Sequence, residues 1–252
     1  MLHELWVGMD KETSFKFVCW GWLQKQLIRS LLKKLNPTVI HTHTDLYVKM
    51  LQTISIKAFY LPLFGNIPVI PEKLKSDKRE VTRNFEKEIS FVLFGGIHTG
   101  VALEGLLSEL KLYSEESRQS IILKLVGRNG GEKARWKNEW EAAGMKVEML
   151  GEQTEAIISE ILSSSSFGLS TTPASLIEKS GSVAAMKEHG LNVLCISRPW
   201  HPRGYTQTDF PDGITIYRKG VVKSFIKNIN FPRSSNSISD VAKKFVTHLA
   251  NS

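Results

Sequence analysis

Five short apolar runs alternate with helical patterns over the second half of the chain, and this alternation limits the possible folds more than any other feature. Strands that alternate with helices of this length form a parallel sheet covered on both faces. The right-handed crossover rule then favours a doubly wound, Rossmann-like α/β domain. The expected strands are residues 89–94, 121–126, 147–150, 167–169 and 193–196, and the expected helices are 101–112, 133–143, 155–162 and 182–189.

The N-terminal third has a less regular pattern. Leucines recur every four residues from Leu23 to Leu35 and predict an amphipathic helix over 20–35 that ends at Asn36-Pro37. Asp45 is expected to cap a second helix with its carboxylate. Further expectations are strands over 38–41 and 56–61, and a charged linker over 72–88. We therefore expect a partial α/β domain with its linker over 1–85 and the Rossmann-like domain over 86–252.

Composition limits the class of protein. With 252 residues, 42% hydrophobic and 23% charged, the chain is an ordinary globular protein. Cys19 and Cys195 are its only cysteines, which favours a reducing, cytoplasmic location and excludes a zinc ribbon. The net charge of +8 favours anionic partners, including an acidic membrane surface contacted from the periphery. No motif for binding nucleic acid is present, so we expect no nucleic-acid partner.

Glycines follow the first two strands of the regular domain. The first strand runs into Gly95-Gly96, and the second into a glycine turn that contains Arg128. Ligands of such sheets bind beyond the carboxyl ends of the strands, where glycine lets the backbone approach a phosphate and arginine can pair with one. A tight turn with a solvated arginine explains the same residues. Both readings are open.

The segment from residue 171 to 193 contains the richest cluster of polar and small residues. Ser180-Gly181-Ser182 is expected to begin a helix, with Lys179 directly before it. Free amides at a helix start, two hydroxyls and a lysine could together hold a diphosphate. An N-cap with close helix packing is the structural alternative. We favour the diphosphate site, because glycine and polar residues cluster at the ligand side of the sheet.

The chain resembles the B-fold glycosyltransferases, specifically the family 4-like enzymes of glycosyltransferase group 1. The resemblance spans about residues 37 to 193 and rests on four segments. These are Pro37-Thr38-Val39-Ile40-His41-Thr42-His43, Leu123-Lys124-Leu125-Val126-Gly127-Arg128, Val147-Glu148-Met149-Leu150-Gly151 and the stretch from Glu178 to Val193. It implies two facing Rossmann-like domains with a sugar nucleotide between them. The first of these domains is shorter here than in the family, so part of it is expected to be lacking.

The resemblance also implies roles for individual residues. Glu178 matches a carboxylate that contacts the donor sugar, and Gly181 matches the glycine at which a helix start receives the diphosphate. The eighth residue after Glu178 is Met186, where the family has a second carboxylate. His41 and His43 are two residues apart, so an extended strand would point both to one face. The resemblance places them at the cleft, whereas a structural reading makes them core histidines.

These observations predict a glycosyltransferase that moves a sugar from a nucleotide-diphosphate donor to an unknown acceptor. His41, His43 and Glu178 are the expected catalytic residues, and the donor is expected to bind at Gly95, Gly96, Arg128, Lys179, Ser180, Gly181 and Ser182. No metal and no cofactor is expected, since the nucleotide sugar is the substrate. The alternatives are a non-catalytic interaction module and a sugar-nucleotide epimerase. The short first domain also raises the expectation of a partner chain that completes the cleft.

Overall fold

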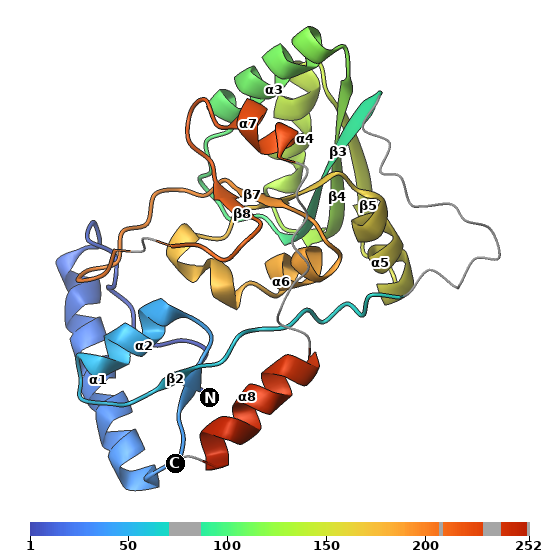
Figure 1. Cartoon of the computed structure of the whole chain (residues 1–252). Helices are drawn as coiled ribbons and strands as arrows, with labels where there is room; N and C mark the ends of the chain where they lie inside the picture. The colour runs from blue at the N-terminus through green and yellow to red at the C-terminus, as the bar shows by residue number, and fades with distance from the viewer. Residues whose placement is uncertain (71–86, 207–208, 229–237, 251–252) are drawn as a thin grey trace.

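The computed structural model describes residues 1–70, 87–206, 209–228 and 238–250. Within these ranges the chain forms a two-stranded sheet near the N-terminus and a six-stranded parallel sheet beyond it (Figure 1). The expected division at residues 85 and 86, and most of the expected linker, lie outside the described residues. The predicted doubly wound α/β class is confirmed.

The six-stranded sheet contains every strand expected in the regular domain and one more. Its order is β5-β4-β3-β6-β7-β8, and every neighbouring pair is parallel. Numbered from β3 as the first strand, this is the 3-2-1-4-5-6 order of dinucleotide-binding folds. The bounds are β3 (Glu88–Gly96), β4 (Ser120–Asn129), β5 (Lys146–Gly151), β6 (Phe167–Ser170), β7 (Val193–Cys195) and β8 (Ile214–Ile216).

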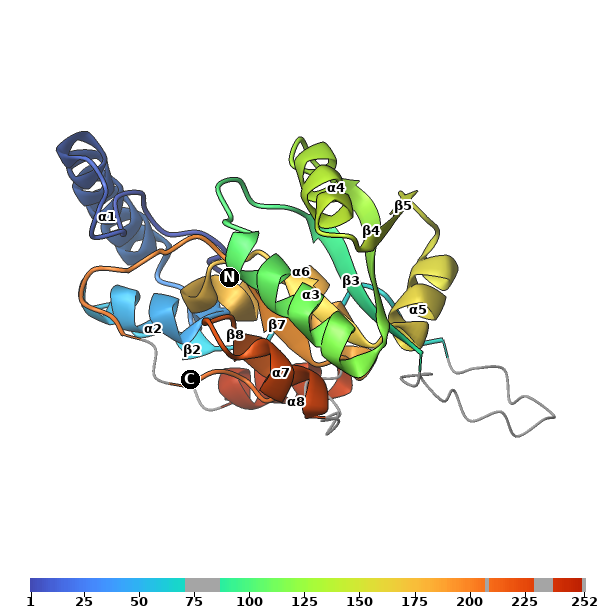
Figure 2. The same ribbon diagram turned by 90° about the horizontal axis from the view of Figure 1, so that it is seen from above.

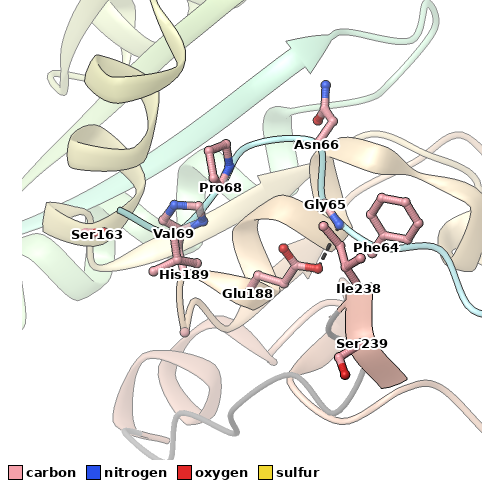
Figure 3. Close-up of a pocket in the computed structure, with 11 residues that line it drawn as sticks. Phe64, Gly65, Asn66, Pro68, Val69, Ser163, Glu188, His189, Ile238 and Ser239 are labelled. Carbon is pink, nitrogen blue, oxygen red and sulfur yellow. Dashed lines mark hydrogen bonds between the residues drawn. The ribbon is translucent and has the colours of Figure 1, made fainter. Parts of the chain in front are cut away.

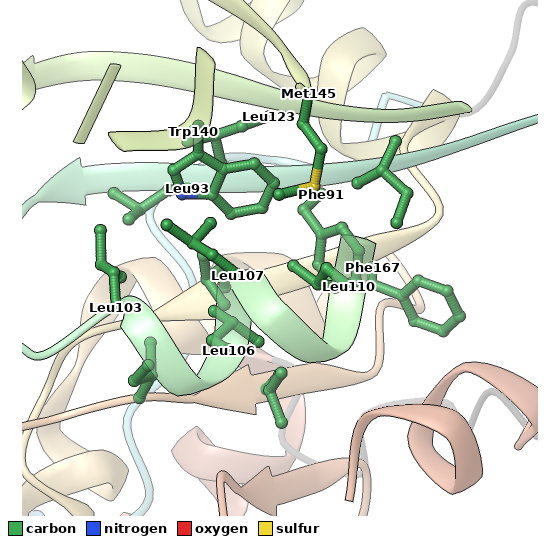
Figure 4. Packing of buried hydrophobic residues seen from close by; sticks show 14 of the residues in the cluster. Phe91, Leu93, Leu103, Leu106, Leu107, Leu110, Leu123, Trp140, Met145 and Phe167 are labelled. Carbon is green, nitrogen blue, oxygen red and sulfur yellow. The ribbon is translucent and has the colours of Figure 1, made fainter. Parts of the chain in front are cut away.

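Helices cover both faces of this sheet because its strands alternate two sets of apolar side chains. Phe91 and Leu93 of β3 face one core, and Val92 between them faces the other. The first core, shown in Figure 4, packs against α3 (Glu104–Ser117), α4 (Lys133–Ala142) and α7 (Val222–Lys227). The second packs against α5 (Glu155–Ser164) and α6 (Gly181–Glu188).

The N-terminal part differs from its expected pattern in several places. Helix α1 (Phe15–Leu35) begins five residues earlier than expected and ends at the expected residue, Leu35. Asn36, which follows it, is in the left-handed conformation. The first strand is β1 (His41–Thr42), later and shorter than the expected 38–41, and it pairs with β2 (Phe59–Tyr60). Val39 and Ile40 precede the strand, and of these the Ile40 carbonyl oxygen accepts from the Phe59 amide of β2 at 2.8 Å, so the expected strand was placed about two residues too early.

Helix α2 (Asp45–Gln52) is present, but Asp45 does not cap it as expected. Thr44 is the N-cap, and its hydroxyl accepts a hydrogen bond from the Tyr47 amide at 3.0 Å. Asp45 is the first helical residue, and its negative charge there still interacts favourably with the positive end of the helix dipole.

Four elements were not expected from the sequence: the 3₁₀ helix η1 (Ala174–Lys179), β8, α7 and α8 (Ile238–Ala250). The first three are six residues or shorter, too short for a clear periodic pattern. Helix α8 lies beside the N-terminal part and not beside the six-stranded sheet (Figure 1). Both chain ends are therefore associated with the same small sheet.

Candidate functional site

The candidate site lies where the strand order reverses, between β3 and β6. The chain continues from β3 and from β6 to opposite faces of the sheet, which makes this edge the usual ligand position of a doubly wound sheet. The loops that follow the two strands are joined by the His98 amide, which donates to the Thr171 hydroxyl at 2.9 Å. A second contact, of 3.1 Å, joins the His98 ring Nδ1 to the same hydroxyl.

Gly95 lets the end of β3 approach the start of α6. Its φ of +91° lies in the left-handed region, and a Cβ there would lie 3.5 Å from the Ser182 Cβ. Gly127 at the end of β4 is just as close to Gly95, since a Cβ on Gly127 would lie 3.4 Å from the Gly95 Cα. Asn129 then donates from its side-chain amide to the Gly95 carbonyl at 2.8 Å. The glycine turns of β3 and β4 thus form one surface beside α6.

The start of α6 is built by hydroxyl groups. Ser180 is the N-cap, and its hydroxyl accepts from the Val183 amide at 3.4 Å. It also contacts the Ser182 hydroxyl at 3.1 Å and accepts from Thr172 at 3.3 Å. A Cβ at Gly181 would meet no atom of the described residues within 4 Å. The helix start is therefore capped by its own serine and still leaves open space at Gly181.

We call Gly95, Gly96, Ser180, Gly181 and Ser182 the mouth, and two cations lie near His98, which follows it in the chain. The pKa of His98 is lowered by burial and by the nearby charges of Arg198 and Lys179. Lys179 is itself held by an ion pair with Glu4 and lies 3.3 Å from the Tyr47 hydroxyl. The mouth thus combines a helix N-terminus with two lysine or arginine charges, which favours an anion.

A cavity of about 560 Å³ opens among the segments that follow β7 and β8. Arg198 lines it together with the aromatic rings of Trp200 and Tyr217. Arg198 also lowers the pKa of His98, so it lies near the loop that follows β3, although none of the residues that line this cavity belongs to the mouth. Arg198 and Thr171 are site residues that the sequence analysis did not select. Thr171 directly follows β6, and Arg198 lies three residues beyond the end of β7. The rule that ligands bind beyond strand ends could therefore have found both.

Glu178, expected to contact the donor sugar, lies at the contact between η1 and α2. Its Oε2 accepts from the Asp45 amide at 3.1 Å, and the Tyr60 hydroxyl is a second partner. Burial raises the pKa of this carboxyl. Burial also lowers the pKa of Lys187, which lines the same small cavity of about 30 Å³. The carboxylate therefore joins the two halves of the chain in this structure.

His41 and His43 both lie in the N-terminal part and are buried. The Nε2 of His41 lies 2.9 Å from Nδ1 of His248 on α8, and its ring also contacts Phe245. His43 places Nδ1 2.8 Å from the Leu61 carbonyl oxygen and its ring against His3. These contacts are those of packed, hydrogen-bonded histidines. Their expected catalytic role stays a prediction.

Arg128 and Met186 complete the set of residues singled out in the sequence. Arg128 is solvent-exposed at the end of β4, and its Nε lies 3.2 Å from Glu152. Met186 is fully buried, and a Cβ at Gly168 of β6 would lie 2.7 Å from its sulfur. A side chain at position 186 thus points into the core under β6. A carboxylate there would be buried without a partner, which is unfavourable.

A second cavity, of about 930 Å³, lies at the opposite end of α6 (Figure 3). The Oε1 of Glu188 accepts from the Gly65 amide at 2.7 Å at its floor, and burial raises the pKa of this carboxyl. Phe64, Val69 and Ile238 supply apolar walls. The helix C-terminus and a carboxylate both oppose an anion there, so this cavity is unsuited to a phosphate.

The described ranges contain no cluster of three or more histidine, cysteine, aspartate or glutamate side chains that could hold a metal ion. In the same ranges no helix is both long enough and apolar enough to cross a membrane.

Solved structures of similar fold match the chain over almost its full length. A mutant of S. aureus TarM in complex with Fondaparinux, alpha-GlcNAc-glycerol and UDP matches with a TM-score of 0.54 at 12% identity, over 96% of this chain and 49% of TarM. S. aureus MnaA, solved with UDP, matches with a TM-score of 0.53 at 12% identity, over 99% of this chain and 67% of MnaA. The chain has the glycosyltransferase B fold.

Matches with lower TM-scores do not bear on the B-fold assignment. WaaG, a glycosyltransferase involved in lipopolysaccharide biosynthesis, matches at 12% identity with a TM-score of 0.41, over 97% of this chain and 80% of its own. No family model matches the chain, and no curated protein matches it in sequence. At such low identity the likenesses describe the fold alone. The chain spans only about half of the TarM structure.

Proposed function

We propose that this chain binds the diphosphate of a nucleotide sugar at the mouth and transfers the sugar to an acceptor. The observation that carries the proposal is the open helix start at Gly181, placed at the switch point of a Rossmann-ordered sheet. Two structures of the same fold, TarM and MnaA, were each solved with UDP, which supports a nucleoside diphosphate as the ligand.

In the proposed complex the diphosphate lies against the amides of α6, next to Gly95 and Gly96. Lys179 and Arg198 neutralise its charge, and their help is greatest as the diphosphate leaves the sugar. The sugar then faces the contact where Glu178 meets Asp45. The base occupies the cavity beside Trp200 and Tyr217. In this arrangement Arg128 is a peripheral contact, and His41 supports the N-terminal part.

The first test is binding of UDP, measured by isothermal titration calorimetry on the full chain. Gly181→Asp places a carboxylate in the open space at the helix start, so we expect affinity to fall at least about tenfold through charge repulsion. Ser224→Asp is the matched control. It adds the same charge on α7, across the sheet from α6, and should leave the affinity within about twofold.

Product analysis separates transfer from the alternatives. A released nucleoside diphosphate together with a glycosylated acceptor supports the proposal. A donor converted to its epimer without acceptor would replace it by epimerisation. Binding of UDP without turnover of any donor would replace it by a non-catalytic module, and equal UDP affinity of wild type and Gly181→Asp would overturn the proposed site.

A further inference from the structure

His98 lies on the loop between β3 and α3, at the rim of the mouth. Its amide and its ring Nδ1 both contact the Thr171 hydroxyl, at 2.9 and 3.1 Å. The next residue, Thr172, donates to the Ser180 hydroxyl of the mouth at 3.3 Å. Two adjacent threonines therefore connect His98 to the start of α6. Figure 2 shows the loop after β3 projecting on the side where the N-terminal part lies.

The backbone before His98 is fixed, whereas the His98 side chain is open to solvent. Ile97 is buried in the core that packs against α3, and its amide donates to the Asn129 carbonyl oxygen at 3.4 Å. His98 is the next residue and is exposed. Its side chain is thus held at one ring nitrogen and accessible at the other, so it can contact a bound ligand without any rearrangement of the loop.

The Thr171 hydroxyl determines which nitrogen of the His98 ring is free. This hydroxyl accepts from the His98 amide, so its own proton can be donated to Nδ1. The neutral ring then carries its proton on Nε2, which has no hydrogen-bond partner among the residues that the structure describes. When the ring takes up a second proton, the same hydroxyl can accept from Nδ1. Thr171 therefore suits both protonation states, and Nε2 is a free donor in both.

The charges around the ring are those that a bound anion would compensate. Burial lowers the pKa of His98, and so do Arg198 after β7 and Lys179 at the end of η1, whereas no carboxylate of the described residues contributes. The acidic group that acts on these cations is Glu4, which pairs with Lys179. Without a ligand the ring is therefore mostly neutral at neutral pH. A phosphate placed among His98, Arg198 and Lys179 would favour the protonated ring.

We propose that His98 is the proton-binding residue of the mouth: when protonated, it donates from Nε2 to a phosphate of the nucleotide sugar, so that the donor and a proton bind together. The inference rests on the proposed function, because it needs a diphosphate at the start of α6. Such coupling is reciprocal, so a proton raises the affinity for the diphosphate by the same factor by which the diphosphate raises the affinity for the proton. The charged ring also stabilises the diphosphate as it leaves the sugar.

Calorimetric titration of the full chain with UDP tests the proposal. His98→Gln keeps a polar side chain that takes up no proton, and His98→Lys carries a permanent charge. As the pH falls from about 8 to about 6.5, the UDP affinity of wild type should rise relative to that of His98→Gln. We expect a rise of about three- to tenfold, the worth of a charged hydrogen bond at a partly exposed position. His98→Lys should bind UDP more tightly than wild type at the higher pH and show no such rise.

The proton itself is measured by repeating the titrations at about pH 7 in PIPES and in imidazole, two buffers that differ in protonation enthalpy. The terminal phosphate of UDP also exchanges protons in this range, and this contribution is common to wild type and variants. Wild type should therefore take up more protons for each UDP bound than His98→Gln does. In NMR spectra of wild type, the ring signal that is missing from His98→Gln should titrate at a higher pH with UDP than without it.

The matched control is His248→Asn, which removes a histidine from α8, next to His41 and away from the mouth. It should keep the wild-type rise in affinity and the wild-type proton uptake. Equal UDP affinity and equal proton uptake of wild type and His98→Gln would overturn the inference and leave the proposed function intact. A ring signal whose titration is not moved by UDP would overturn it on wild type alone. If wild type does not bind UDP at all, the proposed function fails, and this inference fails with it.

Discussion

At the scale of single residues, close backbone contacts position the elements around the site. Gly95 lets the end of β3 lie close to α6, and Gly65 lets the segment that follows β2 lie close to the same helix. A Cβ at Gly65 would lie 2.8 Å from the Ala185 Cα, and the Gly65 amide donates to Glu188 (Figure 3). Backbone atoms of a packed helix cannot move aside cheaply, so glycine is required at this position.

We therefore expect Gly65→Ala to lower the free energy of unfolding by about 1–3 kcal/mol, the usual cost of overpacking. Gly131→Ala is the control, because a Cβ there would meet no atom within 4 Å in the part of the chain that the structure describes. Its effect should stay within about 0.5 kcal/mol. Urea unfolding followed by circular dichroism measures both. Equal stability of the two variants would show that the loop moves freely off α6.

At the scale of elements, α8 is attached to the small N-terminal sheet through a pair of histidines. The His41 ring stacks on His248 and lies 5.3 Å, between ring centroids, from Phe245. Burial, His248, the N-terminal amine and His43 all lower the pKa of His41. One ring nitrogen of the pair must be unprotonated to accept the hydrogen bond between them, and protonation of both rings would set two positive charges against each other.

The sign of the resulting pH dependence follows from the direction of this shift. The folded pKa of His41 lies below the ordinary 6.5, so as the pH falls through 6.5 the unfolded chain takes up more protons than the folded one. We expect the melting temperature to fall on acidification from pH 7.5 to about 5.5. Burial lowers the pKa of His43 and His98 too, so part of the effect belongs to them.

Substitution of His248 separates the contribution of the His41–His248 contact to this pH dependence from the contributions of His43 and His98. His248→Asn removes one of the paired charges and should make the melting temperature less dependent on pH. His201→Asn, at an exposed position, is the control and should keep the wild-type dependence. A pH profile of His248→Asn that runs parallel to that of wild type would show that the pair does not control the docking of α8.

At the scale of the whole molecule, the two halves meet through a few polar contacts beside the mouth. Glu178 accepts from the Asp45 amide, and Lys179 pairs with Glu4 from the N-terminal segment. Arg203 further donates from its guanidinium to the Asp10 carbonyl oxygen at 3.1 Å. The N-terminal segment thus neutralises a lysine that the proposed function assigns to the diphosphate.

Glu4→Gln should consequently raise the affinity for UDP by about two- to fivefold, the worth of a partly exposed ion pair. The control is Glu116→Gln, which frees Lys223 from an ion pair of 2.7 Å on the α3–α7 surface. It makes the same change in net charge and should leave the affinity unchanged. Calorimetric titration of both variants decides the matter, and equal affinities would show that Lys179 does not reach the ligand.

The sequence by itself determined the doubly wound sheet and the position of the mouth. Strand β3 is nine residues long and β4 is ten, and each carries apolar side chains for both cores, so the pattern of each is long enough to be recognised locally. Ser180 before Gly181 likewise identifies a helix start from neighbouring residues alone. Such features depend on residues close together in the chain.

The tertiary structure alone decided which side chains meet. His41 faces α8 because residues 207 positions apart are brought together, and Glu178 reaches Asp45 across 133 positions. No periodicity records such pairs, because their contacts depend on how whole elements pack. The leucines of α1 are a further case in which the sequence does not show which residues a side chain contacts. Their spacing predicts an amphipathic helix, and only the arrangement of the N-terminal segment determines that this stripe faces outward.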